Sequence, residues 1–200
     1  MINSNDLRAG KAIELDGTPY VVTKFAHVKP GKGPAFVRVT LKNMLTGASH
    51  EQTLRSSEKV RRAQLDERIA TFMYAAGDEF HFMDERSYEE FAVAPADLGD
   101  AAPWLKDGTS LKLVFYEGRP VAAEPPTFVE LAVTQTAPGV RGDTATGGSK
   151  PATLETGAVV NVPLFINEGD VVRVDTRTGE YVDRVKQGRK ADQTQEERSS

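Results

Sequence analysis

The sequence has no cysteine, few aromatic residues and no long apolar run. Without cysteine, the chain can form no disulfide, thiolate metal site or cysteine nucleophile. Aromatic residues make up only 8% of the chain, with one tryptophan. No apolar run approaches the ~20 residues that span a bilayer, and the N-terminus lacks the basic and apolar regions of a signal peptide. We therefore expect a cytoplasmic protein without membrane association.

Residue patterns typical of active sites are also missing. His27, His50 and His81 lie in separate segments with no metal-ligand spacing. No glycine-rich phosphate loop of the P-loop type is present, and the glycine-rich residues 142–148 do not join a strand to a helix as a dinucleotide-binding loop does. Acidic pairs such as Glu89–Glu90 are more typical of solvated strand ends than of a general acid and base. We therefore expect neither an enzyme nor a metal or bound cofactor.

Charge is distributed unevenly along the chain. The net charge is −4, yet residues 1–64 carry 11 lysines and arginines against 5 acids, whereas residues 65–127 carry 5 against 13. Residues 128–186 carry 6 against 8, and residues 187–200 carry 3 of each. The basic first third favours approach to a polyanion, while the acidic middle third either avoids that polyanion or faces a basic protein.

Short strand-like runs separated by turn residues predict an all-β protein. Residues 57–66 are predicted to be a connector, and residues 95–106 have the spacing of a short helix or of 3₁₀ turns. The expected strands are 11–15, 18–25, 35–41, 51–56, 68–75, 79–84, 88–94, 111–116, 129–134, 158–162, 171–175 and 181–185.

Strands of this spacing favour small closed barrels, because closure removes exposed sheet edges. We predict three consecutive small β-barrels, at residues 1–64, 65–127 and 128–186. The third contains a polar stretch, 138–152, that we expect to be a long functional loop. Residues 187–200 have the composition of a disordered tail.

A six-residue segment between two strand-like runs is the most informative motif. It reads Lys29, Pro30, Gly31, Lys32, Gly33 and Pro34. Its flanks predict a β-hairpin with a long tip. The glycines free the backbone beside Lys32 and the prolines restrict the loop, so one flexible cation is presented at the end of a stiff arm. An ordinary solvated hairpin tip would have the same composition, so the loop alone leaves both interpretations open.

Longer motifs extend over roughly residues 3–186. They are 6–10, the hairpin motif 28–36, the segment 80–91 and, in the last third, 142–157, 162–166 and 169–185. Together they resemble the signature of bacterial translation elongation factor P. The resemblance implies an SH3-like barrel of the KOW type followed by two OB-fold barrels in an L shape. It also implies a monomer that binds both ribosomal subunits beside the P-site peptidyl-tRNA and relieves stalling at consecutive prolines.

The same resemblance implies roles for individual residues. Lys32 would reach toward the CCA end of the tRNA, with Lys29, Pro30, Gly31 and Gly33 supporting it. In many members the tip residue is lengthened covalently, so modification of Lys32 by a lysine-modifying enzyme is implied as well. The tRNA- and ribosome-binding residues implied in the last third are Gly142, Asp143, Thr144, Ala145, Thr146, Gly147, Gly148, Lys150, Tyr181 and Arg184.

The sequence departs from the family pattern at a few positions, and alternatives remain. Pro34 should stiffen the tip, and a lysine at position 32 argues against the branch whose tip arginine is rhamnosylated. A paralogue with altered specificity and a general OB-type binder of single-stranded RNA are alternatives. The low aromatic content disfavours the second, since such binders stack bases on exposed rings.

Overall fold

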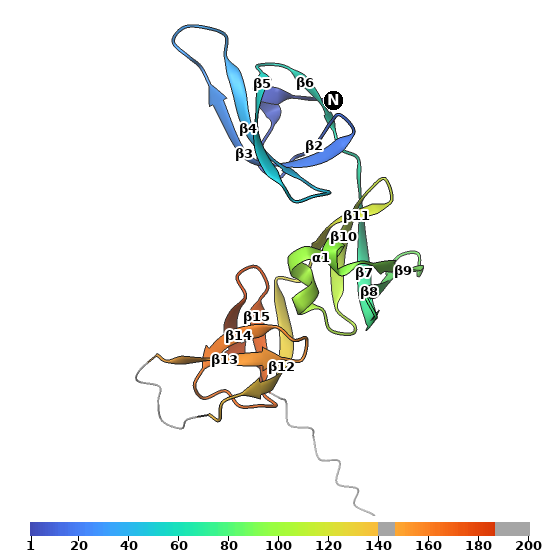
Figure 1. Ribbon diagram of the computed structural model, residues 1–200, viewed down its shortest axis with the longest axis vertical. Helices are drawn as coiled ribbons and strands as arrows, with labels where there is room; N and C mark the ends of the chain where they lie inside the picture. The colour runs from blue at the N-terminus through green and yellow to red at the C-terminus, as the bar shows by residue number, and fades with distance from the viewer. Residues whose placement is uncertain (140–146, 187–200) are drawn as a thin grey trace, which may run out of the picture. The chain divides into compact units, whose positions relative to one another are not determined.

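A computed structural model of the chain describes residues 1–139 and 147–186. It confirms the all-β prediction: three separate antiparallel sheets account for nearly all regular structure (Figure 1). The chain divides into two compact units. One contains Met1–Ala102 and Asp107–Glu124, and the other contains Pro103–Lys106 and the residues from Pro125 onward. None of the described helices is long and apolar enough to cross a membrane.

The first sheet has six strands in the order β1-β6-β2-β3-β4-β5. Its elements are β1 (Ile2–Asn3), the 3₁₀ helix η1 (Ser4–Asp6), β2 (Ala12–Leu15), β3 (Thr18–Val28), β4 (Phe36–Asn43), β5 (Ser49–Arg55) and β6 (Lys59–Arg62). Alternating side chains point inward, as the two-residue period of a strand requires. The core that they fill is centred on Leu7, Ile13, Val22, Val39 and Leu41, all fully buried.

The prediction of a connector over residues 57–66 is wrong in part. Lys59–Arg62 form β6, which pairs with both β1 and β2. Three of its four residues are charged and exposed, and only Val60 is buried. A single inward side chain is too weak a signal of alternation to identify a strand from sequence.

The second sheet has five strands in the order β11-β10-β7-β8-β9. Its strands are β7 (Leu65–Ala76), β8 (Glu79–Asp84), β9 (Glu90–Val93), β10 (Ser110–Tyr116) and β11 (Arg119–Glu124). Between β9 and β10 lie helix α1 (Pro95–Leu98) and the 3₁₀ helix η2 (Gly99–Trp104), as the sequence predicts for this segment. Buried rings of Phe72 and Phe82, 5.5 Å apart, occupy its inner face.

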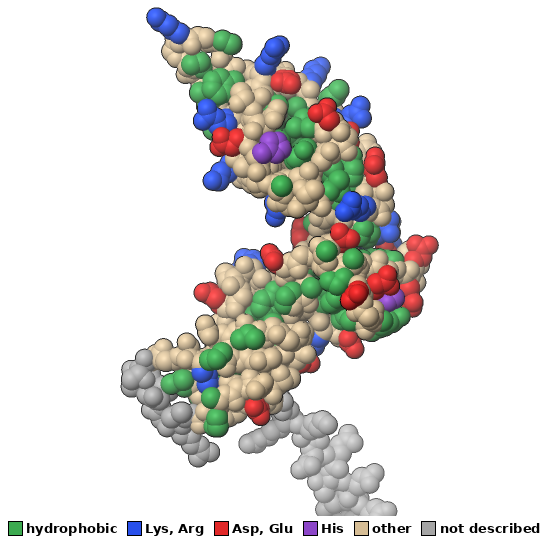
Figure 2. Space-filling model, in the orientation of Figure 1, with side chains coloured by type: hydrophobic (Ala, Val, Ile, Leu, Met, Phe, Trp, Pro, Cys, Tyr) green, Lys and Arg blue, Asp and Glu red, His purple; other side chains and the backbone are tan. Residues whose placement is uncertain are grey.

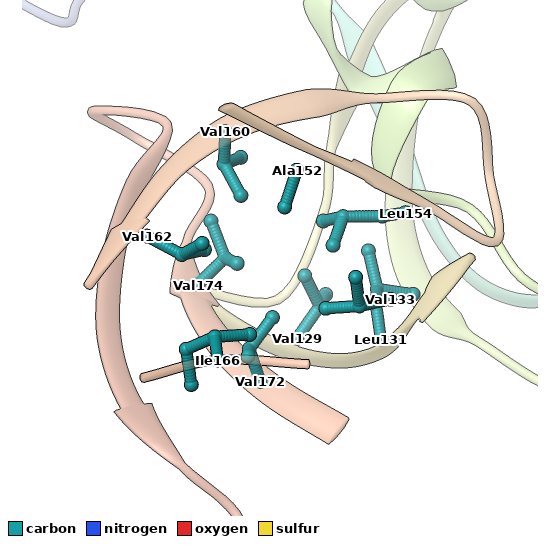
Figure 3. Close-up of a cluster of buried hydrophobic side chains, with 10 residues drawn as sticks. All are labelled: Val129, Leu131, Val133, Ala152, Leu154, Val160, Val162, Ile166, Val172 and Val174. Atoms are coloured by element: carbon teal, nitrogen blue, oxygen red, sulfur yellow. The ribbon is translucent and has the colours of Figure 1, made fainter. Parts of the chain in front are cut away.

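The third sheet has five strands in the order β14-β13-β12-β15-β16. Its strands are β12 (Phe128–Thr136), β13 (Ser149–Leu154), β14 (Val159–Pro163), β15 (Val171–Asp175) and β16 (Glu180–Arg184). Aliphatic side chains, most of them β-branched, converge on its core (Figure 3), and Trp104 packs against it. The buried residues are Val129, Leu131, Val133, Ala152, Leu154, Val160, Val162, Ile166, Val172 and Val174.

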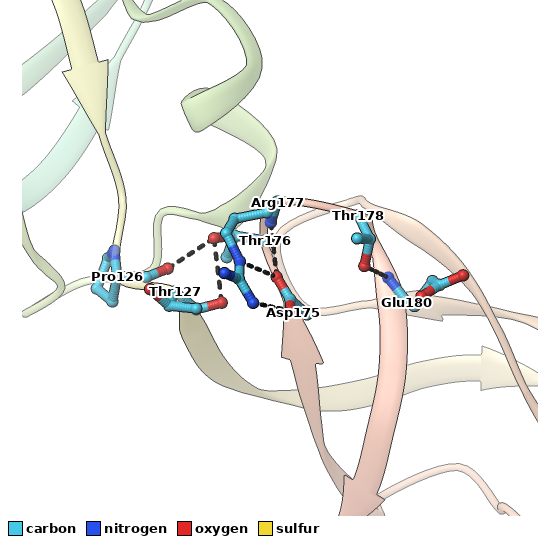
Figure 4. Close-up of polar contacts among 7 residues, drawn as sticks. All are labelled: Pro126, Thr127, Asp175, Thr176, Arg177, Thr178 and Glu180. Atoms are coloured by element: carbon cyan, nitrogen blue, oxygen red, sulfur yellow. Dashed lines mark hydrogen bonds and ion pairs between the residues drawn. The ribbon is translucent and has the colours of Figure 1, made fainter. Parts of the chain in front are cut away.

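The entry into this barrel is fixed by polar contacts. The Thr176 hydroxyl donates to the carbonyl of Pro126 at 2.7 Å (Figure 4). Beside it, the Arg177 guanidinium contacts both oxygens of Asp175, at 3.1 and 2.8 Å. These charge-assisted contacts lower the pKa of the Asp175 carboxyl.

The long loop predicted over residues 138–152 is shorter than expected, because β13 already begins at Ser149. Pro151 concealed the strand, since proline is rare in the middle of a sheet. Its carbonyl still accepts a hydrogen bond from the Thr136 hydroxyl at 3.0 Å. The register shift in β12, between Val133 and Gln135, lies opposite Thr153 and Leu154 and not opposite Pro151. The predicted tail, residues 187–200, lies outside the described residues.

Candidate functional site

The hairpin motif forms the tip of the longest strand pair in the first barrel. β3 and β4 pair antiparallel from Tyr20 opposite Asn43 to Val28 opposite Phe36. The residues between Val28 and Phe36 make the turn, and Figure 1 shows this loop projecting beyond the rest of the barrel. Gly33 has φ +108°, a backbone conformation that L side chains rarely adopt. The sequence therefore predicted both the hairpin and the glycine-dependent turn.

Lys32 is exposed at this tip. Within residues 1–139 and 147–186, no carboxylate forms an ion pair with it. Lys29, Pro30, Gly31 and Gly33 are exposed as well. The tip thus presents an ammonium group to solvent without intramolecular neutralisation, which is the state required of a group that contacts an external anion.

The outer face of the β3-β4-β5 sheet, which we call the cationic face, continues the positive charge of the tip. Its exposed cations are Lys24, Arg38, Lys42 and Arg55. Cross-strand pairing places Arg38 between Ala26 and Thr53, and Arg55 opposite Phe36. The Arg38 guanidinium lies 6.0 Å from the centroid of the Phe36 ring, at the outer limit of a cation–π contact. Figure 2 shows lysine and arginine side chains over this barrel and at the hairpin end.

The cationic face depends on a register shift in β3. Val22 pairs with Leu41 on the buried face, whereas Lys24 pairs with Thr40 on the exposed face, so Thr23 is an inserted residue. A bulge of this kind bends the strand and increases its twist. Sequence reasoning identified the excess charge of the first barrel, but only the register shows which cations share a face.

In the third barrel, the structure brings some of the predicted residues together. Gly147, Gly148 and Tyr181 line one open groove, which Asn161 and Thr178 also line. A Cβ atom on Gly148 would lie 2.9 Å from Cδ1 of Leu164, so this position accommodates only glycine unless Leu164 moves. Gly142, Asp143, Thr144, Ala145 and Thr146 lie outside the described residues.

Lys150 lies inside the barrel and not on its surface. Its side chain is only 8% exposed, and its ammonium donates to the carbonyl of Ala137. Lys150 therefore connects β13 to the end of the segment that follows β12. In this geometry the ammonium is bonded to a backbone carbonyl of the same barrel, so the sequence identified the residue but not its contact.

Arg184 lies at the end of a connected group of side chains and backbone groups. Its guanidinium lies 3.7 Å from Oδ2 of Asp170 and 5.5 Å from the centroid of the Phe165 ring. The same Asp170 oxygen accepts the backbone N–H of Asn167 at 2.9 Å. The Asn167 side chain in turn accepts the N–H of Gly139 at 2.8 Å and donates to the carbonyl of Phe165 at 3.3 Å. No sequence signal marked Asn167, and Asp170 was marked only as part of the motif 169–185, with no contact assigned to it.

Tyr181 is partly buried against the hydrophobic core. Burial raises the pKa of its phenol, and the nearby Asp183 carboxylate adds to this effect. Tyr181 is therefore a neutral hydroxyl at the groove. In the described part of the chain, no cluster of histidines and carboxylates has metal-binding geometry.

The structure thus defines a three-sheet β protein with a cation-tipped hairpin and a glycine-lined groove. Three family models match consecutive parts of the chain: the "Elongation factor P (EF-P) KOW-like domain" at residues 3–60, the "Elongation factor P (EF-P) OB domain" at 65–123 and "Elongation factor P, C-terminal" at 129–184. These matches confirm a KOW-like barrel followed by OB-type barrels. They cover most of the chain, which therefore belongs to the elongation factor P family of translation factors.

Individual relatives agree with this assignment. The chain is 54% identical over 186 residues to elongation factor P of Natranaerobius thermophilus, covering 93% of this chain and 99% of that protein. It is 56% identical over 185 residues to elongation factor P of Coprothermobacter proteolyticus, covering 92% and 100%. A solved structure of translation initiation factor 5A from Methanococcus jannaschii has a similar fold, with a TM-score of 0.52 at 24% identity over 60% of this chain and 88% of that one.

Proposed function

We propose that this protein binds the ribosome beside the P-site peptidyl-tRNA and promotes peptide-bond formation at consecutive prolines. In this proposal Lys32 reaches toward the CCA end of the tRNA. The single observation that carries it is the exposed, unneutralised Lys32 ammonium at the end of a hairpin whose outer face is also cationic. In this proposal the protein works as a monomer in the cytoplasm, where the ribosome and its peptidyl-tRNA are found.

The proposed mechanism is positional and not chemical. Proline is a poorly oriented nucleophile. Holding the tRNA ester in a reactive geometry therefore raises the rate of peptide-bond formation, because the reacting groups no longer have to find that geometry by chance. Lys32 contributes charge-assisted hydrogen bonds to phosphate or 2′-hydroxyl groups. The cationic face supplies further contacts to the phosphate backbone of the RNA, through Lys24, Arg38, Lys42 and Arg55. Phosphate contacts of this kind carry no sequence specificity of their own. No acid, base or bound cofactor on the protein is needed for this step.

In the third barrel, the groove beside Gly147 and Gly148 offers backbone groups that RNA could approach closely. Tyr181 adds a neutral hydroxyl, and Arg184 adds an exposed cation near the small subunit. The residues 142–146 complete the tRNA-recognition loop in this proposal. A covalent extension of Lys32 by a modifying enzyme would lengthen the reach of the tip without a change in the barrel, because the side chain has no intramolecular partner among the described residues.

The proposal is tested by Lys32→Ala in a strain whose own copy of the gene is deleted. The expected result is loss of rescue of a Pro-Pro-Pro reporter with an unchanged thermal melting temperature, since the side chain makes no described hydrogen bond. Lys59→Ala, an exposed lysine on β6, is the matched control and should retain rescue. Full rescue by Lys32→Ala would overturn the assignment of the tip. Intact-mass analysis and peptide mapping over residues 25–38 would show whether Lys32 is extended.

A further inference from the structure

The outer face of the second sheet is not used by the proposed function. On this face Ile69 and Tyr74 are each 47% exposed, a large exposure for such residues. Ile69 and Thr71 alternate in β7 with the buried Ala70 and Phe72, so they point away from the core. Apolar side chains exposed together on one sheet face are typical of interaction surfaces.

The cross-strand register joins these residues into one continuous surface, which we call the docking face. Thr71 pairs with Met83, and Met83 pairs with Glu90, so the surface extends from β7 across β8 to β9. Farther along the sheet, Tyr74 pairs with His81. Their rings stack with centroids 4.5 Å apart and an interplanar angle of 14°. The docking face therefore has an apolar and aromatic centre.

Carboxylates surround this centre. Glu79 lies 3.9 Å from the His81 ring nitrogen Nε2 and is largely exposed. At the other end, Lys112 is opposite Ile69 and lies between Glu67 and Glu124, at 3.7 and 2.9 Å. Glu85 and Glu90 are also exposed at this face. Lys112 is therefore already neutralised, and the rim presents a net negative potential.

We propose that the docking face binds a basic protein segment on the ribosome. This inference rests on the proposed function, because the ribosome supplies the partner. Nucleic acid is disfavoured, since its phosphates would meet the carboxylate rim. An arginine side chain fits both parts of the surface: its guanidinium stacks on the exposed Tyr74 ring, which His81 supports from the other side, and pairs with the neighbouring Glu79. An apolar centre inside a polar rim is also the usual arrangement of a protein–protein interface.

Site-specific photocrosslinking on purified ribosomes with P-site tRNA tests the partner. A benzophenone amino acid replaces Ile69 in one variant and Phe36, on the cationic face, in another. The Ile69 variant is expected to crosslink to a lysine- or arginine-bearing segment of a ribosomal protein, and the Phe36 variant to RNA. A crosslink from position 69 to RNA, or none while position 36 reacts, would overturn the docking proposal alone. If neither position reacts and the protein does not sediment with ribosomes, the proposed function fails, and the docking proposal fails with it.

A charge-reversal pair tests the energetics. Glu79→Lys with Glu90→Lys should weaken ribosome affinity about tenfold, because two carboxylates of the rim that attract a basic segment become cations that repel it. Asp100→Lys with Asp107→Lys makes the same change in net charge at exposed positions off this sheet, and should leave affinity equal or higher. Equal effects of the two pairs would mean that only net charge matters, and would overturn a localised docking site.

Discussion

Asn167 accepts a hydrogen bond from the backbone amide of Gly139, 28 residues earlier in the chain, at 2.8 Å. This contact leaves no room for a side chain at position 139, because a Cβ on Gly139 would lie 2.7 Å from the Asn167 oxygen. Through Asp170, the same asparagine is connected to Arg184. The segment that follows β12 and the exposed cation on β16 are therefore held by one group of contacts.

Removing the Asn167 side chain should reduce function more than stability. Asn167→Ala removes two hydrogen bonds, each worth about 0.5–1.5 kcal/mol, and releases Gly139 in the segment that follows β12. Thr134→Val, which removes a hydroxyl bonded to the Thr153 carbonyl in the same barrel, is the control. We expect a modest fall in melting temperature for both variants, measured by calorimetry, and weaker tRNA-dependent ribosome binding for Asn167→Ala only. Similar binding by the two variants would contradict this prediction.

The two glycines beside Lys32 should respond differently to alanine. Gly33 has φ +108°, so Gly33→Ala forces the tip into another backbone conformation, at a cost of about 1 kcal/mol or more. Gly31 has no positive φ, and nothing lies within 4 Å of the position of its Cβ. Gly33→Ala should impair rescue of a Pro-Pro-Pro reporter, whereas Gly31→Ala should be tolerated. If Gly31→Ala impairs rescue as much as Gly33→Ala, steric access to the tip matters and the backbone conformation at Gly33 does not.

The cationic face should make ribosome binding sensitive to salt. Each lysine or arginine that contacts a phosphate contributes about 1 to the slope of log affinity against log salt concentration. Arg38→Ala with Lys42→Ala should therefore lower that slope by about 2. Lys11→Ala with Lys59→Ala removes two exposed cations outside this sheet face, and should change the slope less. Filter binding over a range of potassium concentrations measures both, and equal slopes for the two pairs would argue against a localised contact.

Acid stability should report on Asp84 in the second barrel. Its Oδ1 accepts the backbone N–H groups of Ser87 and Arg86, at 2.8 and 2.7 Å, and these bonds hold the pKa of the carboxyl below its usual value. A carboxyl whose pKa is lower in the folded state than in the unfolded state stabilises the fold. This contribution is fully present above the pKa of the unfolded state, about 3.9, and is lost as the pH falls through the pKa of the folded state. Melting temperature should therefore fall more steeply below about pH 4 for the wild type than for Asp84→Asn. Parallel curves from pH 7 to pH 2 would refute this assignment.

Sequence reasoning found elements with strong local signals. β8 and β15 match their predicted bounds, because Val171–Asp175 alternates regularly and a Gly77 turn marks the start of β8. β1, β6, β11 and β13 were missed. In β13, the Ser149-Lys150-Pro151 sequence combines polar residues with proline, and its inward positions include the buried Lys150. A charged residue inside a barrel depends on a partner distant in sequence, here the Ala137 carbonyl, and a local pattern does not contain that information.

The candidate site divides in the same way. Lys32 and its glycines were predictable because turn residues act locally. The cationic face and the docking face were not, since each is composed of residues from three or more strands and depends on their register. Composition correctly located the charge in the first and second thirds of the chain. It could not show that exposed apolar residues accompany the acids on one face of the second sheet.

The bulge at Thr23 separates two properties of the hairpin that are usually linked. Deleting Thr23 would leave Val22 opposite Leu41 and Lys24 opposite Thr40, so every side chain would keep its face. The strand would nevertheless lose the bend that the inserted residue causes. The direction of the hairpin therefore depends on Thr23 in β3, whereas the chemistry of its tip depends on Lys32. Evolution can therefore redirect this hairpin with a single insertion or deletion and leave its cation and its charged surface intact.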